Sequence, residues 1–481
     1  MRGILLIVLA FFCLSAMPLL AGANAQYQQV SGLIDIRSTF SDGKHDLEYL
    51  VKLAKERGFD AIFINDHDRV AMEYGLFPWR NLIRKRIDKP SVNLGGAENY
   101  LAAIADVGRK YTDMLILPGV EAAPFYYWTG NPFSEEGLTA NDWERHLLVM
   151  GLPTAQDYAT LPDIHNNYQP PQPTGKRFGI VAIFALVAIF GLIIVKWSGA
   201  FTYIGGALTL VGTLFALDSL PFFSAPLFDQ YHGPQGIAPY QSVIDYVNDK
   251  GGVTFWNHME TNSGRRKMNP IQISTPPYPA ALEEAKSYTG FAAIYGDTTV
   301  MTEPGMWWDK ILLGYCRGER PRPIWGISTA DYHEEGPGTK SLGYYQTVFL
   351  VQERSAAAIL AALKVGKMYA AQGSYEKRPI LSQFTVSDTA SDSVGVSGDE
   401  IQLTGQAQVD IRLDNADQQP YAVKVRLIRG GQPIETFNGK TSMVIHYKDN
   451  AATSEGKTYY RIDVKGEMGQ IVSNPIFVSR P

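Results

Sequence analysis

Two long, uncharged apolar runs lie next to each other in the middle of the chain, at residues 178–195 and 197–217. Each is about as long as a helix that crosses a bilayer, roughly 17–25 residues. Lys196 alone separates them, so the two helices would form a tight hairpin whose ends emerge on one side of the membrane. A pair of buried core helices is the alternative, but soluble domains seldom have two such runs in tandem. We therefore predict a transmembrane helical hairpin over residues 178–217, in contact with membrane lipid.

The sequence on either side of these runs alternates between short apolar segments and segments with helical periodicity, from residue 33 to about residue 373. Residues 47–54 repeat apolar side chains at helical spacing, and Gly58 is placed to end that helix. Such alternation is typical of a mostly parallel α/β architecture. We predict one α/β domain over residues 26–377, which the hairpin interrupts.

The composition changes after about residue 378, where polar and apolar residues alternate in short segments. Val423-Lys424-Val425-Arg426-Leu427 is one half-buried strand of this kind, and Gly430-Gly431 supplies a turn. This pattern predicts a C-terminal β-sandwich over residues 378–481.

The first residues have the pattern of an export signal. Arg2 gives a positive start, residues 4–20 an apolar stretch, and Ala23-Asn24-Ala25 a small-residue cleavage site. We predict a signal peptide over residues 1–25, with an uncleaved anchor helix as the alternative. Both place the following domain on the extracytoplasmic, periplasmic side of the membrane. The net charge of −5 and the lack of a clustered Lys/Arg stripe argue against a nucleic-acid partner.

Side chains that bind metals lie next to the ends of several predicted strands. They are His67 in Asn65-Asp66-His67-Asp68, Glu121, His146, His258, Asp331 and His333. Barrel enzymes gather their active groups where strands end and loops begin. For any one of these residues a structural role is the better explanation, but imidazoles and carboxylates at successive strand ends favour a metal site.

Taken in chain order, the segments that contain these residues resemble the motifs of the PHP (polymerase and histidinol phosphatase) family. The C-terminal region is similar to that of the family's carbaryl-hydrolase-like branch. The matching segments are Ser41-Asp42-Gly43, Asn65-Asp66-His67-Asp68, Pro118-Gly119-Val120-Glu121, His146-Leu147-Leu148, Asn257-His258 and Asp331-Tyr332-His333. The resemblance covers residues 33–373 apart from the hairpin. It implies a distorted (β/α)7 barrel, up to three divalent metal ions and hydrolysis of phosphate esters. Members of that branch also act on carboxyl esters or carbamates.

One departure from the family pattern concerns its opening His-x-His motif, which here reads Asp35-Ile36-Arg37. Residues two apart on a strand share a face, so both Asp35 and Arg37 should point into the site. The Asp35 carboxylate can bind a metal, whereas the Arg37 guanidinium cannot. A guanidinium ~5 Å from a dication is repelled by roughly 6–7 kcal/mol at an effective dielectric constant of 20. Unless a carboxylate such as Asp35 lies between them, this repulsion would empty the adjacent metal position.

The resemblance implies that the other two metal positions are intact. One would use Glu121, His146 and His258, and the other would use Asp42, His67 and His333. Asp35 and Asp331 would serve the altered position or its remnant. We further predict two residues that act on catalysis: Asp66, which would orient an imidazole, and Arg37, which would bind an anionic substrate oxygen in forked hydrogen bonds.

We therefore expect a hydrolase with about two divalent ions of Zn, Mn or Fe, acting on a small-molecule or lipid-linked phosphate or other ester. A carboxyl-ester or carbamate hydrolase with the same metals is one alternative. A non-catalytic binding or sensor protein is another, because His-x-His is lost. The hairpin falls between His146 and His258. If the hairpin leaves the barrel at the active face, we expect a substrate that is itself associated with the membrane. The alternative, that the hairpin serves only as an anchor, is equally compatible with the sequence.

Overall fold

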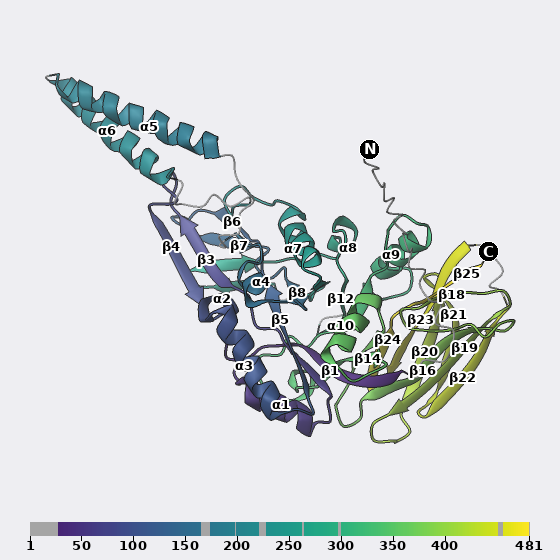
Figure 1. The fold of residues 1–481 in the computed structure, drawn as a ribbon. Coiled ribbons are helices and arrows are strands. Elements are labelled where there is room, and N and C mark those ends of the chain that lie inside the picture. The colour runs from purple at the N-terminus through teal and green to yellow at the C-terminus, as the bar shows by residue number, and fades with distance from the viewer. Residues whose placement is uncertain are drawn as a thin grey trace, which may run out of the picture.

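The computed structural model describes residues 27–164, 174–197, 199–220, 228–261, 264–296, 300–450 and 456–480. The predicted signal peptide, residues 1–25, lies outside the described residues. The fold is mixed α/β and is built around one large sheet (Figure 1). A run of seven neighbouring strands in that sheet carries the candidate site. These strands are β1 (Gln28–Ile36), β2 (Ala61–Ile64), β5 (Leu115–Ala122), β8 (Leu147–Met150), β9 (Val253–Trp256), β12 (Gly290–Ile294) and β13 (Trp325–Ser328).

Six of these strands run in one direction and β8 runs against them. The pairs β1–β2, β2–β5, β9–β12 and β12–β13 are parallel, and β8 is antiparallel to both β5 and β9. The residue that precedes β8, His146, therefore lies at the edge where the other strands end. The sequence predicts short apolar strands at residues 61–64, 114–117, 146–150, 252–256, 291–295 and 323–326. They overlap β2, β5, β8, β9, β12 and β13.

The two ends of this run meet at the same edge. The segment after β13 bonds to the end of β1, through Ala330 N to Ile34 O at 3.0 Å, Tyr332 N to Asp35 O at 3.0 Å and Arg37 N to Tyr332 O at 2.9 Å. Elsewhere β1 pairs with β14 (Tyr345–Val351), which leads into β15 (Met368–Gln372). The strand ladder is thus not a simple ring, and the (β/α)7 barrel stays a prediction.

Helix α1 (Leu47–Glu56) shows how the connecting helices form. The Asp46 side chain accepts a hydrogen bond from the Tyr49 backbone N–H and caps the helix, and apolar residues at helical spacing are buried. Gly58 follows the C-terminus with φ of 74°, as the sequence predicts. The other helices of this region are α2 (Val92–Gly95), α3 (Ala97–Lys110), α4 (Ala155–Ala159), α7 (Ala238–Asp249), α8 (Ala281–Glu284), α9 (Trp307–Cys316) and α10 (Ala356–Val365), with a 3₁₀ turn at Gly338–Lys340.

Helices α5 (Thr174–Val195) and α6 (Ala200–Asp218) pair as a hairpin that projects away from the rest of the molecule (Figure 1). Both are long and apolar enough to cross a membrane, and only 6% and 11% of their apolar windows are buried. The alternative of two buried core helices is therefore wrong. The backbones approach closely at Gly191 and Gly205, where an added Cβ atom would lie 2.5 Å from backbone nitrogen of the opposite helix.

The base of the hairpin contacts a loop that the sequence did not single out. Asp218, the last residue of α6, accepts hydrogen bonds from Asn81 N at 2.9 Å and Leu82 N at 3.1 Å. This loop joins β3 (Val70–Gly75) to β4 (Arg84–Lys89), a two-stranded hairpin that follows β2. The C-terminal end of α6 thus lies against the β3–β4 loop, near the edge of the sheet that carries the candidate site.

Four short strands form a second small sheet near that edge. Their order is β10–β11–β7–β6, with β6 (Tyr127–Gly130), β7 (Leu138–Asn141), β10 (Arg265–Met268) and β11 (Ile271–Ser274).

The C-terminal region has two sheets that share one apolar core. One sheet contains β16 (Pro379–Asp388), β17 (Val394–Val396), β19 (Ala407–Asn415) and β22 (Met443–Asp449). The other contains β18 (Glu400–Gln402), β20 (Ala422–Arg429), β21 (Gln432–Lys440), β23 (Gly456–Gly466), β24 (Gly469–Ser473) and β25 (Ile476–Arg480). Because β24 pairs with β15, the large sheet continues across the domain boundary placed at residues 377/378.

Candidate metal centre

The residues singled out by the sequence converge at the edge where the seven strands meet. Asp35 lies in β1 and Arg37 just after it, Asp42 in the following loop, Asp66 and His67 after β2, Glu121 in β5, His146 before β8, His258 after β9, and Asp331 and His333 after β13. Among the described residues, three groups could each hold a metal ion through atoms within 4.8 Å of one another. We call them the Glu121 group (His67, Glu121, His146), the Asp42 group (Asp42, His67, His333) and the Asp35 group (Asp35, Glu121, Asp331).

The Glu121 group surrounds one carboxylate oxygen. Glu121 Oε2 lies 3.1 Å from His67 Nδ1 and 3.1 Å from His146 Nδ1, while Glu121 Oε1 lies 3.4 Å from His258 Nε2. Ligand atoms about 2.0–2.2 Å from one ion are separated by roughly 3–3.5 Å, so these spacings suit a shared divalent ion. The expected set of Glu121, His146 and His258 is thus brought together, and His67 joins it.

The His67 ring supports this fit. Its Nδ1 is buried and has no hydrogen-bond partner among the described residues, although Glu121 Oε2 is only 3.1 Å away. A buried nitrogen without a hydrogen bond is costly, and a metal ion between the two atoms would satisfy both.

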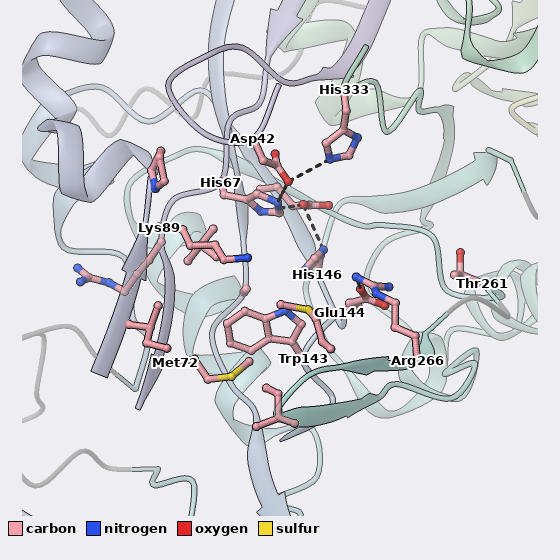
Figure 2. Close-up of a pocket in the computed structure, with 18 of the residues that line it drawn as sticks. Asp42, His67, Met72, Lys89, Trp143, Glu144, His146, Thr261, Arg266 and His333 are labelled. Atoms are coloured by element: carbon pink, nitrogen blue, oxygen red, sulfur yellow. Dashed lines mark ion pairs between the residues drawn. The ribbon is translucent and has the colours of Figure 1, made fainter. Parts of the chain in front are cut away.

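The Asp42 group lies on the other side of the same ring. Asp42 Oδ2 is 3.3 Å from His333 Nε2 and 3.6 Å from His67 Nε2. Figure 2 shows these contacts as dashed lines around Asp42 and His67. His67 therefore faces both groups, one ring nitrogen to each. A neutral imidazole has one free lone pair, so His67 can serve only one ion at a time.

Carboxylates and imidazoles alter one another's pKa here. Burial opposes ionisation of Glu121, but Arg37 and His146 hold the pKa of Glu121 well below its usual value. Burial likewise opposes protonation of the rings, but the bond to Glu121 raises the pKa of His258 to about 9. The bond to Asp42 and the charge of Asp331 raise the pKa of His333 to about 9. The donor set is anionic enough to attract cations.

The Asp35 group already contains a cation, the guanidinium of Arg37. Arg37 Nη1 lies 2.5 Å from Asp35 Oδ1, and Nη2 pairs with Glu121 and lies 3.4 Å from Asp331 Oδ1. The Arg37 side chain is 0% exposed and has three carboxylate partners. Its charge is neutralised inside the protein and Arg37 does not line the pocket, so the geometry gives no support to binding of a substrate anion, and that role stays a prediction.

Asp66 also differs from expectation. Its two oxygens accept hydrogen bonds from the backbone and hydroxyl groups of Ser38 and Ser41, at 2.5 to 3.1 Å. Asp66 is fully buried and contacts no imidazole in these bonds. It braces the turn that presents Asp42, and these bonds give no support to the role of orienting a ligand histidine, which stays a prediction.

Asn257 is a positioning residue that the sequence indicated only through its neighbour His258. Its amide donates to Asp35 Oδ2 at 2.8 Å and to Glu121 Oε1 at 2.7 Å, and its carbonyl oxygen accepts from Thr329 at 3.0 Å.

The backbone of the site is strained at three residues. Asp35, His258 and Asp331 have φ values of 73°, 27° and 45°, which residues other than glycine seldom adopt. Such strain costs about 1–3 kcal/mol per residue and clusters at functional sites.

A pocket of about 1000 Å³ opens over the Glu121 and Asp42 groups. It is walled by β3 and β4 on one side and by the small β6–β7–β10–β11 sheet on the other. Figure 2 shows Trp143 in this pocket and the Lys89 side chain reaching toward His67 and His146. Lys89 lines the pocket, and no ion pair of its amine is found among the described residues. Sequence reasoning missed Lys89, because it lies in a basic strand that reads as a solvated edge.

Comparison with known proteins gave distant likenesses only. No family model matches the chain, and no curated protein matches it. A solved structure from Bacteroides vulgatus, described as a two-domain protein containing a predicted PHP-like metal-dependent phosphoesterase, is 11% identical, covers 91% of each chain and has a TM-score of 0.35. An amidohydrolase from Chromobacterium violaceum with bound sulfate and no metal is 14% identical, covers 65% of this chain and 89% of its own, and has a TM-score of 0.28. Membership of the PHP family thus stays a proposal.

Proposed function

We propose that this protein is a divalent-metal-dependent hydrolase of phosphate esters, held at a membrane by the α5–α6 hairpin. The observation that carries the proposal is a pair of neighbouring carboxylate–imidazole groups, one on each side of the His67 ring, that both open to one pocket. Two close divalent ions in such a site would supply an activated water and neutralise charge on the ester.

The side chains around the ions would fix the geometry. Arg37 and Asn257 hold the Glu121 carboxylate from two directions, so it cannot rotate away from His67 and His146. Asp66 fixes the turn that carries Asp42. Trp143 forms part of the pocket wall and would exclude water from a bound ester.

The preference for phosphate over a carboxyl ester rests on Lys89. A lysine amine that lines the pocket without an ion pair is suited to an anionic phosphate oxygen. The three arginines that line this pocket are already paired, Arg69 with Asp163, Arg84 with Glu73 and Arg266 with Glu144. Lys85 is a second lysine of the lining, but the Lys89 side chain is the one that reaches toward His67 and His146 (Figure 2). Lys89 would thus take over the anion-binding role first expected of Arg37.

The test uses full-length protein in detergent, loaded with Zn or Mn, and compares p-nitrophenyl phosphate with p-nitrophenyl acetate. Lys89→Met should raise KM for the phosphate about 10-fold and leave the acetate unchanged. Arg86→Met, on the same strand but outside the pocket lining, is the matched control and should change neither. No metal-dependent hydrolysis of either ester would favour the non-catalytic binding protein. Acetate hydrolysis alone, unaffected by Lys89→Met, would favour the carboxyl-ester hydrolase.

We also propose that the catalytic region lies on the extracytoplasmic, periplasmic side. Support comes from the export-like first residues, while the α5–α6 hairpin would leave its two ends on one side of the membrane without deciding which side. A C-terminal alkaline phosphatase fusion, which is active only outside the cytoplasm, should be active in cells. An inactive fusion with normal expression would reverse the orientation.

A further inference from the structure

The pocket is larger than the candidate metal centre needs. Asp42, His67 and His146 lie together in its lining (Figure 2). The rest of the lining includes the apolar side chains of Met72 and Ile87 of the β3–β4 hairpin and of Met268 of β10, with the charged Arg84, Lys85 and Arg266 among them. A small phosphate would fill only the polar end of a volume of about 1000 Å³. The remainder suits a hydrocarbon chain, since apolar surface is stabilised by burial against apolar groups.

This apolar arm leads toward the base of the helical hairpin. Leu76 and Ile83 line the pocket and bond to each other, from Leu76 N to Ile83 O at 2.8 Å. Leu82, which directly precedes Ile83, donates its backbone N–H to Asp218 at the end of α6. In the same loop the ring of Trp79 lies 5.9 Å from that of Phe215 in α6. One loop therefore forms both the pocket wall and the seat of the membrane helix.

The β3–β4 hairpin exposes apolar and basic side chains beside one another. Phe77 in its loop lies outside the pocket lining and is 78% exposed, and Ile87 on β4, which also lines the pocket, is 52% exposed. Arg84 and Lys85 lie exposed between them. Exposed aromatic and aliphatic side chains beside basic ones are typical of segments that lie at the surface of an anionic bilayer.

We propose that the substrate is an amphiphilic phosphate ester drawn from the membrane in which α5 and α6 lie. Its phosphate binds at the Glu121 and Asp42 groups, and its hydrocarbon chain lies along the arm between β3–β4 and β10–β11. This proposal rests on the proposed phosphoesterase function and names its substrate class. In the reaction, a water oxygen bonds to phosphorus while the bond from phosphorus to the lipid oxygen breaks. One water proton passes to the leaving lipid alcohol, and inorganic phosphate is the other product.

The kinetic test compares hexadecyl phosphate in detergent with the soluble p-nitrophenyl phosphate, using metal-loaded full-length protein. The double variant Ile83→Asn/Ile87→Asn should lower kcat/KM for hexadecyl phosphate at least 10-fold and leave p-nitrophenyl phosphate within 2-fold. Val394→Asn is the matched control, because Val394 is an apolar strand residue of similar exposure, 49%, in the C-terminal region. Equal effects of the double variant on both substrates would overturn the proposal.

A binding test separates failure of this proposal from failure of the proposed function. Full-length protein loaded with Zn or Mn is irradiated with a hexadecyl phosphonate, whose C–P bond is not hydrolysed and which carries a diazirine at the end of its chain. The labelled peptides are then identified. Labels within residues 70–89 or 265–272 support the apolar arm even if the protein hydrolyses neither ester. Labels confined to residues 174–218 overturn it even if p-nitrophenyl phosphate is hydrolysed, because the chain then contacts only the membrane helices.

Discussion

Substitution of Arg37 by alanine should destabilise the metal-free protein and create room for an additional metal ion. The guanidinium has three carboxylate partners, Asp35, Glu121 and Asp331, and is 0% exposed. Its loss would leave these acids close together without a cation. Removing one partner of a buried ion pair costs about 3–5 kcal/mol. Asp35 adds to the cost, because burial already raises its pKa while Arg37 opposes that rise.

The shift in melting temperature follows from the size of the chain. An unfolding entropy of about 2.1 cal/mol/K per residue gives roughly 1 kcal/mol/K for 481 residues. A loss of about 3–5 kcal/mol then lowers Tm by about 3–5 °C if the chain unfolds as one unit. Calorimetry on metal-free protein measures this. Elemental analysis after reloading with Zn or Mn should show about one more ion per chain than the wild type, with part of the lost stability regained.

Arg461 offers a matched control. It is also fully buried and forms a two-pronged ion pair, with Asp309 at 2.7 Å, far from the candidate metal centre. Arg461→Ala should cost similar stability, yet bind no additional ion and regain nothing from metal. The reasoning is refuted if Arg37→Ala melts as the wild type does, or if it is destabilised but gains no metal relative to Arg461→Ala.

Three further predictions concern the same centre. The wild type should bind about two divalent ions per chain by elemental analysis; Glu121→Gln should remove at least one, whereas His446→Ala in the C-terminal region should remove none. Asp66→Asn should weaken metal binding about 10-fold in a chelator competition, since the Ser38–Ser41 turn loses its charged acceptor; unchanged affinity would contradict the bracing role. The pKa values of His258 and His333 are raised to about 9 in the folded, metal-free protein. The protonated rings therefore stabilise the fold fully below about pH 6.5, the pKa of an unfolded histidine. This stabilisation is lost as the pH rises through about 9. The Tm of the metal-free protein should therefore fall between about pH 6.5 and 9, while the affinity for metal rises. Calorimetry in buffers of different ionisation enthalpy should detect proton release when metal binds at pH 7. An absence of proton release would contradict the shifted pKa values.

The strand ends of the site could be read from the sequence because each ligand type follows a short apolar run. His67 after β2 and His258 after β9 are examples in which local pattern and position agree. The pocket walls could not be read in this way. Strand β4 is basic and exposed along its whole length, so it has no buried face that would predict it. The loop between β3 and β4 contacts α6, more than a hundred residues later in the chain, and such a contact cannot be predicted from local sequence.

The roles of Arg37 and Asp66 show a second limit. Strand periodicity correctly predicted that Asp35 and Arg37 face the same interior, but periodicity carries no information on which charges meet there. Glu121 comes from a strand distant in the sequence. Its contact with Arg37 holds the guanidinium inside the protein, away from the pocket where a substrate would bind. Asp66 was assigned by proximity to His67, yet the backbone after β2 turns its carboxylate toward Ser38 and Ser41.

The charges at the centre connect the loss of His-x-His with the choice of substrate. The carboxylates of Asp35, Asp42, Glu121 and Asp331 bring four formal negative charges, and Arg37 removes one, which leaves three. Two divalent ions would more than balance these three charges and leave one positive charge on the centre. The Lys89 amine, which lines the same pocket, would add a second. A neutral carboxyl ester would leave this excess uncompensated, whereas a phosphate monoester with up to two negative charges would neutralise it. The guanidinium would thus keep a third dication out while it leaves the site the charge that favours a phosphate, so the proposed phosphoesterase function does not require the His-x-His motif.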